Sequence, residues 1–269
     1  MNIKIYQIDA FADKVFAGNP AAVCPLDKWL STETMQQIAH ENNLSETVFF
    51  VKHEEHFQIR WFTPSVEVEL CGHATLAAAW VLYHYLNYKE NTIRFYSPYS
   101  GILTVSRYGD FLTLDFPADT TQAVELTEEF LQCFSKQPRE VFKGKTDYLL
   151  VFDNEQQIRE LIPRLQQIAC IPARGIIVTA KGDKEDFVSR FFAPQSGINE
   201  DPVTGSAHTT LAPFWAERLG KTDLTARQLS QRQGYLQCRV TGDRVEISGQ
   251  CVPYMTGELC IRYNDRSDN

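Results

Sequence analysis

The sequence contains two copies of one unit, and this duplication limits the possible folds more than any other feature. The segment Gln36-Gln37-Ile38-Ala39 recurs 130 residues later as Gln166-Gln167-Ile168-Ala169. Ten of the 29 aligned positions from 36 to 64 are identical at this offset, whereas chance matching at average composition would give roughly two. Because the offset is close to half of the 269 residues, we expect two domain-sized copies rather than a solenoid, whose repeats are far shorter.

After a three-residue insertion the offset becomes 133, which aligns Cys71-Gly72-His73-Ala74 with Thr204-Gly205-Ser206-Ala207. In the first copy a helix over residues 75–86 is apolar on almost all sides, which is typical of a helix enclosed by its own sheet. Two such copies predict similar lobes related by a pseudo-twofold axis, with a cleft between them. Clefts between lobes are preferred places for small-molecule sites.

Several local patterns add detail to this prediction. Gly109-Asp110 and its counterpart Gly242-Asp243 stand between alternating segments and predict hairpin turns. Pro213 lies inside the second central helix and is expected to kink or shorten it. Residues 117–146 are interpreted as the linker region, which gives an N-terminal lobe of residues 1–117 and a C-terminal lobe of residues 118–269.

Charge and hydropathy argue against two classes of partner. The net charge of −8 comes with no Lys/Arg-rich run, so we expect no nucleic-acid partner. The longest apolar stretch, residues 76–86, contains His84 and is too short to cross a bilayer. The first residues lack the layout of a signal peptide. We therefore expect no membrane partner and a cytoplasmic location.

Cysteine and histidine usage gives no sign of a metal site. The seven cysteines are odd in number and scattered, without a C-x-x-C pair, and the six histidines form no ligand pattern. The chain also has neither G-x-G-x-x-G nor G-x-x-x-x-G-K. We expect no metal, no nucleotide and no disulfide framework.

Glu46 is the first position at which the two copies differ chemically. It stands at the entrance to a buried strand, and its counterpart is Ile176. A capping or ion-pairing role is the commoner one for a glutamate at a strand end, by roughly ten to one. The equivalent isoleucine indicates a buried position, however, and a buried carboxylate can both take and give a proton near neutral pH.

The two aligned helix starts are the second candidate. Gly72 and Gly205 are each followed by a polar residue, His73 or Ser206, so the first N–H groups of both helices are expected to be free to bind a carboxylate from both lobes. Plain helix capping is an equally good interpretation of each start. Cys71 has no partner thiol and is more typical of a buried hydrophobic residue than of a base.

Asp201 is the third candidate, because it directly precedes Pro202 just before the second helix start and the first copy has no such proline turn. Its alternative role is that of a turn former.

These positions belong to five motifs that cover essentially the whole chain. The motifs are the run from Asp9 to Val23 containing Gly18-Asn19-Pro20, Asn43-Leu44-Ser45-Glu46-Thr47, Arg60-Trp61-Phe62-Thr63-Pro64, Cys71-Gly72-His73-Ala74-Thr75, and Asp201-Pro202-Val203-Thr204-Gly205-Ser206-Ala207-His208. In this order they resemble the PhzF-like family. The resemblance implies the diaminopimelate epimerase fold, an α/β (α+β) architecture of two lobes, each a β-barrel-like mixed sheet around a central helix. It also implies a homodimer without cofactor.

The same resemblance implies roles for individual residues. Glu46 is similar to the family's general acid/base, and His73 and Asp201 are similar to the residues that orient substrate and assist proton movement. Gly72 and Ser206 are similar to the donors to the substrate carboxylate. The related epimerases have a catalytic cysteine at both helix starts, whereas this chain has Cys71 and Thr204, which argues against a two-thiol epimerase.

The function expected from the sequence is a cofactor-independent isomerisation in which Glu46 moves a proton on a small carboxylic acid. Two alternatives remain open. One is a single-base epimerase of an amino or hydroxy acid, with Cys71 as the second proton donor. The other is a carboxylate-binding protein without turnover.

Overall fold

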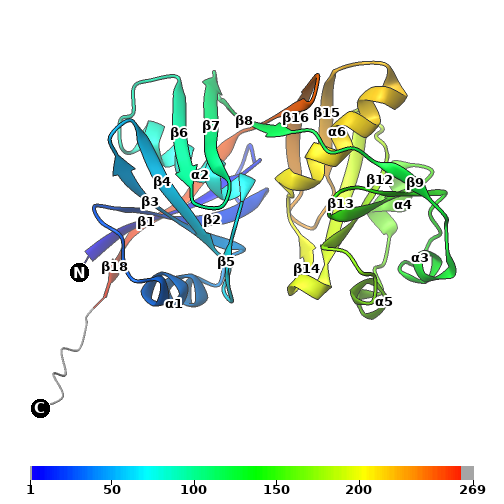
Figure 1. Cartoon of the computed structure of the whole chain (residues 1–269), viewed down its shortest axis with the longest axis horizontal. Coiled ribbons are helices and arrows are strands. Elements are labelled where there is room, and N and C mark those ends of the chain that lie inside the picture. Colours follow the sequence, from blue (N-terminus) through cyan, green and yellow to red (C-terminus); the bar gives the residue numbers. More distant parts are fainter. Residues whose placement is uncertain (1, 262–269) are drawn as a thin grey trace, which may run out of the picture.

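The two sequence copies form two lobes that lie side by side in a computed structural model, which describes residues 2–261 (Figure 1). The first lobe is built from β1 (Asn2–Ala10), β2 (Asn19–Leu26), α1 (Thr32–Asn42), β3 (Glu46–His53), β4 (His56–Phe62), β5 (Glu67–Val68), α2 (Gly72–His84), β6 (Thr92–Ser97), β7 (Gly101–Tyr108) and β8 (Phe111–Pro117).

The second lobe repeats this order with additional short elements. It contains β9 (Gln122–Val124), α3 (Glu128–Gln132), β10 (Glu140–Lys143), β11 (Asp147–Val151), α4 (Glu155–Glu160), α5 (Leu165–Ala169), β12 (Gly175–Lys181), β13 (Phe187–Ala193), the 3₁₀ helix η1 (Pro194–Ser196), β14 (Ile198–Asp201), α6 (Gly205–Leu219), β15 (Asp223–Gln228), β16 (Gly234–Thr241) and β17 (Arg244–Gly249). The last strand, β18 (Cys251–Cys260), returns to the first lobe.

Each lobe is a mixed sheet around one central helix, as the sequence predicts. In the first lobe β2 runs parallel to β3 and β4 parallel to β6, while the remaining neighbours are antiparallel. The second lobe has the same pattern, with β11 parallel to β12 and β13 parallel to β15. Ten of the thirteen residues of α2 are buried, which explains why this helix is apolar on almost every side.

The pseudo-twofold axis passes through the antiparallel pair β8–β17, which joins the two sheets. Leu114 pairs with Ile247, the residue 133 positions further on, so a residue pairs with its own counterpart. A second contact of this kind lies between the central helices, where a Cβ built on Gly72 would stand 3.9 Å from the Cα of Gly205. The N-termini of α2 and α6 therefore meet at the axis.

A repeated ion pair shows that the duplication extends to side chains. Arg60 contacts Glu67 through Nε and Nη2 and lies over the ring of Phe62. The counterparts do the same, with Arg190 on Glu200 and over Phe192. Because both copies keep this arrangement, we assign it to the stability of the scaffold.

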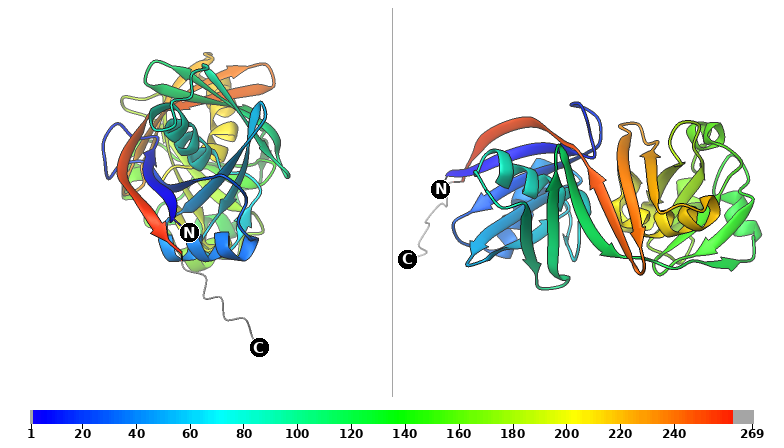
Figure 2. Two further views of the ribbon diagram at one scale, coloured as in Figure 1. Left: turned by 90° about the vertical axis from the view of Figure 1, so that its left-hand side faces the viewer. Right: turned by 90° about the horizontal axis from the view of Figure 1, so that it is seen from above.

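The chain crosses between the lobes twice. After β8 it enters the second lobe and β9 pairs with β10, and after β17 it re-enters the first lobe, where β18 pairs with β1 from Asn2↔Cys260 to Ala10↔Cys251 (Figure 2). The interpretation of residues 117–146 as a linker was wrong, since β9, α3 and β10 lie in this stretch and belong to the second lobe. The division of the chain into lobes of residues 1–117 and 118–269 remains a proposal. Strand β18 follows residue 117 in the chain but pairs with β1 of the first lobe.

Two local expectations can be compared with the structure. The Gly109-Asp110 and Gly242-Asp243 hairpins are confirmed, since they connect β7 to β8 and β16 to β17. The expected shortening at Pro213 was wrong, because α6 continues through it to Leu219 and has 15 residues, against 13 in α2. The helices within residues 2–261 are too short or too polar to cross a lipid bilayer.

Arg232 fastens the second lobe to the loop between β1 and β2. Its guanidinium donates to Asp9 Oδ1 at 2.8 Å and to the carbonyl oxygens of Ala17 and Gly18 at 2.9 Å. Gly18 has a left-handed φ of +66°, and a Cβ there would lie 2.1 Å from the Ala10 carbonyl oxygen, so this tight loop requires glycine. The loop ends at Asn19, the first residue of β2.

Replacing Arg232 is expected to destabilise the protein through Asp9, which is 2% exposed. Burial already raises the pKa of Asp9, while the Phe16 N–H and Arg232 lower it. For Arg232→Met we expect a loss of about 1–3 kcal/mol in the free energy of unfolding by urea, because the remaining carboxylate is buried without its charge partner. Because the pKa of Asp9 is raised in the folded state, Asp9 is uncharged below about pH 4, and there the loss of unfolding free energy in Arg232→Met is smallest. The loss becomes larger as the pH rises and Asp9 ionises.

Asp9→Asn is the matched control for this prediction. The double variant Asp9→Asn/Arg232→Met should recover part of the loss, because no buried charge remains. If the losses of the two single variants simply add in the double variant, Arg232 does not act by neutralising the buried Asp9 carboxylate.

Candidate active site

The site is centred on an ion pair between the first strand residue of β3 and the first turn of α2. Glu46 Oε2 lies 3.0 Å from His73 Nε2, and both residues are buried. The two groups are not aligned as a hydrogen bond, so Oε2 has no hydrogen-bond partner among residues 2–261. Burial disfavours a charged imidazole, but the hydrogen-bonding contact with the Cys71 sulfur and the Glu46 carboxylate outweigh this effect and raise the pKa of His73 well above its ordinary value.

Cys71 is the N-cap residue of α2, and its side chain makes no capping hydrogen bond. Its Sγ lies 3.5 Å from His73 Nδ1. Burial and the nearby Glu46 raise the pKa of the Cys71 thiol to about 11, so the thiol is protonated at neutral pH. Cys71 is thus a neutral neighbour of the charged pair.

Asn19 connects this pair to the second lobe. Its Nδ2 lies 3.2 Å from His73 Nδ1, 2.7 Å from Asp201 Oδ1 and 3.0 Å from the Val203 carbonyl oxygen. An amide has only two hydrogens for these three atoms. With His73 protonated at Nδ1, both hydrogens go to Asp201 and Val203, so the cluster is consistent with an imidazolium facing Glu46.

Asp201, the last residue of β14, is held in a form that fits a carboxylate. Oδ1 accepts from Asn19, and Oδ2 accepts from Thr204 Oγ1 at 2.6 Å. Burial raises the pKa of Asp201 to about 6, against the lowering effect of His73 and of the two hydrogen bonds. This side chain therefore changes charge within a unit or two of neutral pH.

The start of α6 is organised around an arginine. Ser206 Oγ accepts from Arg174 Nη1 at 2.8 Å, and Arg174 is paired with Asp147, which is 3% exposed. Among the residues that the structure describes, no acceptor lies on the backbone N–H groups of Gly72, His73, Gly205 and Ser206. These N–H groups point out of two helix N-termini, where the helix dipoles favour an anion.

The structure brings Glu46, His73 and Asp201 into one cluster, and it places Gly72, Gly205 and Ser206 at the two facing helix starts. Sequence analysis missed three residues, namely Asn19, Asp147 and Arg174. Arg174 was detectable by the comparison that singled out Glu46, since its counterpart at an offset of 130 is Leu44. Asn19 and Asp147 gave no such signal, because their contacts join segments far apart in the chain.

Glu46, Cys71 and His73 also form a set that a metal ion could use. Their ligand atoms lie within 4.8 Å of one another, and carboxylate, thiolate and imidazole are all ligands of Zn²⁺. Because the sequence predicts no metal, activity is measured with and without a chelator.

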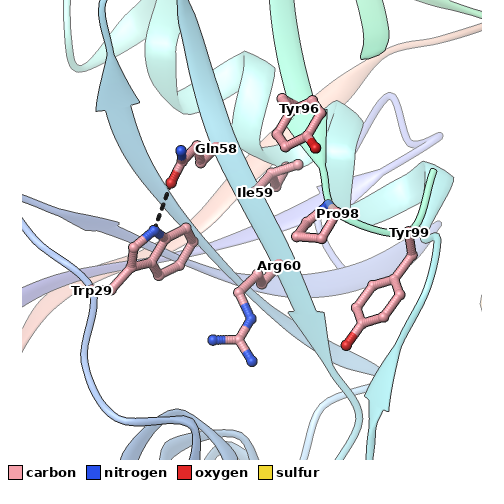
Figure 3. A pocket seen from close by; sticks show the side chains of 7 residues that line it. All are labelled: Trp29, Gln58, Ile59, Arg60, Tyr96, Pro98 and Tyr99. Carbon is pink, nitrogen blue, oxygen red and sulfur yellow. Dashed lines mark hydrogen bonds between the residues drawn. The ribbon is translucent and has the colours of Figure 1, made fainter. Parts of the chain in front are cut away.

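A hollow of about 320 Å³ lies elsewhere on the first lobe (Figure 3). Its lining includes Trp29, Arg60 and Tyr99, and the Trp29 indole donates to Gln58. Arg60 is already engaged by Glu67 and Thr32. None of the candidate site residues lines this hollow.

Known proteins resemble this chain over nearly its full length. The model of a family described as phenazine biosynthesis-like protein (PhzC-PhzF) matches residues 8–257. A protein of Pseudomonas aeruginosa named an uncharacterized isomerase is 52% identical, over 96% of this chain and 99% of the relative. A second uncharacterized isomerase, from Halalkalibacterium halodurans, is 43% identical over 97% of this chain and 100% of the relative.

Solved structures confirm the expected fold. A PhzF-family protein of Enterococcus faecalis superposes with a TM-score of 0.95 at 44% identity, covering 97% of this chain and 100% of that one. A hydroxyproline epimerase of Agrobacterium vitis has a TM-score of 0.62 at 9% identity, covering 96% of this chain and 92% of the other. At that identity the likeness shows the fold alone.

Asn19→Ala is expected to raise the pKa of Asp201 further above its value of about 6, because the variant removes a donor that stabilises the carboxylate. A hydrogen bond to a charged group is worth about 1.5–3 kcal/mol, which corresponds to roughly 1–2 pKa units. Carbon-13 NMR of labelled aspartate carboxyls measures this shift. Asn2→Ala, at an exposed asparagine, is the control, and an unchanged or lower pKa in Asn19→Ala would contradict the assigned contact.

Proposed function

This chain belongs to the phenazine biosynthesis-like (PhzC-PhzF) family, and on that premise we propose that it is an isomerase which moves a proton on a small carboxylic acid, with Glu46 as general acid/base. The relatives named as isomerases support the reaction class. A cytoplasmic homodimer that needs neither cofactor nor metal is part of the same proposal.

The observation that carries the proposal is the buried Glu46–His73 ion pair beside two helix starts with free N–H groups. The imidazole of His73 lies 3.0 Å from Glu46 Oε2, and this oxygen has no hydrogen-bond partner among residues 2–261. Glu46 is therefore able to remove a proton from a carbon activated by a neighbouring double bond or carboxylate. The N–H groups of Gly72, Gly205 and Ser206 stabilise the charge that develops on the substrate.

The proton then returns from Glu46 to another carbon on the same face of the substrate. Asp201 and Asn19 hold the imidazole and the substrate in place during this transfer. Ile176 occupies the position equivalent to Glu46 and has no proton to exchange, which supports one base rather than two.

The position of Cys71 bears on the epimerase alternative. An epimerase needs a second proton donor on the opposite face of the reacting carbon. Cys71 Sγ lies within 4.8 Å of the Glu46 carboxylate, less than the roughly 6–7 Å between two groups that each reach one carbon from opposite faces at about 3–3.5 Å, and this favours the one-base isomerase. The binding-protein alternative differs in requiring no proton exchange at all.

Proton exchange tests the role of Glu46. We expect the wild type to introduce deuterium from D₂O into a member of a panel of unsaturated, hydroxy and amino carboxylic acids. Glu46→Gln should slow this exchange by about 10²–10⁴-fold, the usual contribution of a positioned general base, while ligand binding is retained. Proton NMR measures both, with and without EDTA.

The exposed Glu41→Gln is the matched control. Exchange that persists in Glu46→Gln would sink the proposal, and label at a single stereocentre with inversion would favour the epimerase.

The pH dependence of exchange is expected to follow Asp201. Because the pKa of Asp201 is about 6 and its bonds fit the carboxylate form, the exchange rate should rise as the pH increases through about 6. His208 does not contribute to this limb, since burial lowers its pKa to about 4. Rate profiles of wild type and Asp201→Asn check this, and an acid limb that survives in Asp201→Asn would assign it to another group.

A further inference from the structure

The lobes differ in charge where they face the site. In the first lobe, the second residue of the central helix, His73, contacts the acidic Glu46. In the second lobe, the equivalent residue, Ser206, accepts a hydrogen bond from the basic Arg174. Arg174 precedes Ile176, the counterpart of Glu46, by two positions. The two helix starts are thus flanked by an acid on one side and a cation on the other.

The guanidinium of Arg174 has N–H groups that make no hydrogen bond within the described residues. Its Nε and Nη2 contact Asp147, and Nη1 donates to Ser206 Oγ at 2.8 Å. These bonds use three of the five guanidinium N–H groups. The Arg174 side chain is 39% exposed while that of Asp147 is 3% exposed. Asp147 therefore holds the guanidinium from the protein side, and two N–H groups remain for a ligand.

The position of Arg174 is fixed by several further contacts. Its backbone N–H donates to the Thr146 carbonyl at 2.9 Å, and its own carbonyl accepts from Ser196 Oγ. The guanidinium lies over the ring of Phe191, with Cζ 5.2 Å from the ring centroid. A cation held in this way loses little conformational freedom when an anion binds.

We propose that Arg174, positioned by Asp147 and Ser206, binds the carboxylate of the substrate from the second lobe. This inference rests on the proposed function and extends it. The acid group is held at the start of α6 by Arg174 together with the N–H groups of Gly205 and Ser206, and the reacting carbon faces Glu46. The substrate class is then carboxylic acids that bind through their negative charge, and the corresponding amides are poor ligands.

A pair of probes that differ only in charge tests this role. Benzoate and benzamide have nearly the same shape, and their binding to wild type, Arg174→Gln and Arg174→Lys is measured by ligand-observed NMR titration. For Arg174→Gln we expect benzoate affinity to fall roughly 10- to 100-fold, the worth of a charge-assisted hydrogen bond, with benzamide affinity nearly unchanged. Arg174→Lys should restore only part of the benzoate affinity, since an ammonium cannot keep the fork geometry.

Two controls separate binding from folding. Arg218→Gln removes another arginine of the same lobe, paired with Glu140, and should leave both affinities unchanged. Because Arg174→Gln leaves Asp147 buried without its partner, Asp147→Asn/Arg174→Gln is measured as well, and it should show the same selective loss of benzoate affinity.

Equal losses for both probes, unchanged benzoate affinity in Arg174→Gln, or no benzoate binding to the wild type would each overturn the proposal. These titrations need no turnover, so their failure is distinct from a failure of the proposed isomerase. Normal benzoate selectivity with no proton exchange would reject only the latter.

Discussion

The site depends on the contact between two helix N-termini at the pseudo-twofold axis. Gly72 and Gly205 face each other there, and β8 and β17 pair beside them through Leu114 and Ile247. With no side chain on either glycine, the two helix starts approach each other closely, and a Cβ built on Gly72 would lie 3.9 Å from the Cα of Gly205. The positive ends of two helix dipoles meet at one place, and a negative charge is stabilised there. Glu46, in contact with His73 of the first turn of α2, is a buried carboxylate beside this point.

Comparing the two lobes separates side-chain contacts that both copies keep from those that only one copy has. The pairs Arg60–Glu67 and Arg190–Glu200 occur in both lobes and stabilise equivalent strands. By contrast, Glu46 corresponds to Ile176, His73 to Ser206, and Arg174 to Leu44. Each of these differences lies at the helix starts. The duplicated frame is symmetric, whereas the charged groups in contact with its two central-helix starts, Glu46 and Arg174, differ between the halves.

The lobes are held together by covalent and non-covalent connections around this contact. The chain crosses between the lobes after β8 and again after β17, β18 joins the sheet of the first lobe through β1, and Arg232 reaches from the second lobe to Asp9. The loop fastened by Arg232 ends at Asn19, whose amide touches both His73 and Asp201. The alignment of the candidate residues from the two lobes is therefore coupled to the packing between the lobes.

The sequence by itself determined the duplication, the enclosed central helices and the hairpins, and it singled out Glu46, His73 and Asp201 as candidates, because repeats, periodicity and motifs can be read from the order of residues alone. It did not determine the return of β18 to the first lobe, the continuation of α6 through Pro213, or the contacts of Asn19, Asp147 and Arg174. Those features depend on pairings between residues as far apart as Asn2 and Cys260, or on packing around α6, which continues although Pro213 disfavours a helix. Only the tertiary structure decides them, because burial and charge neighbours arise when distant segments meet.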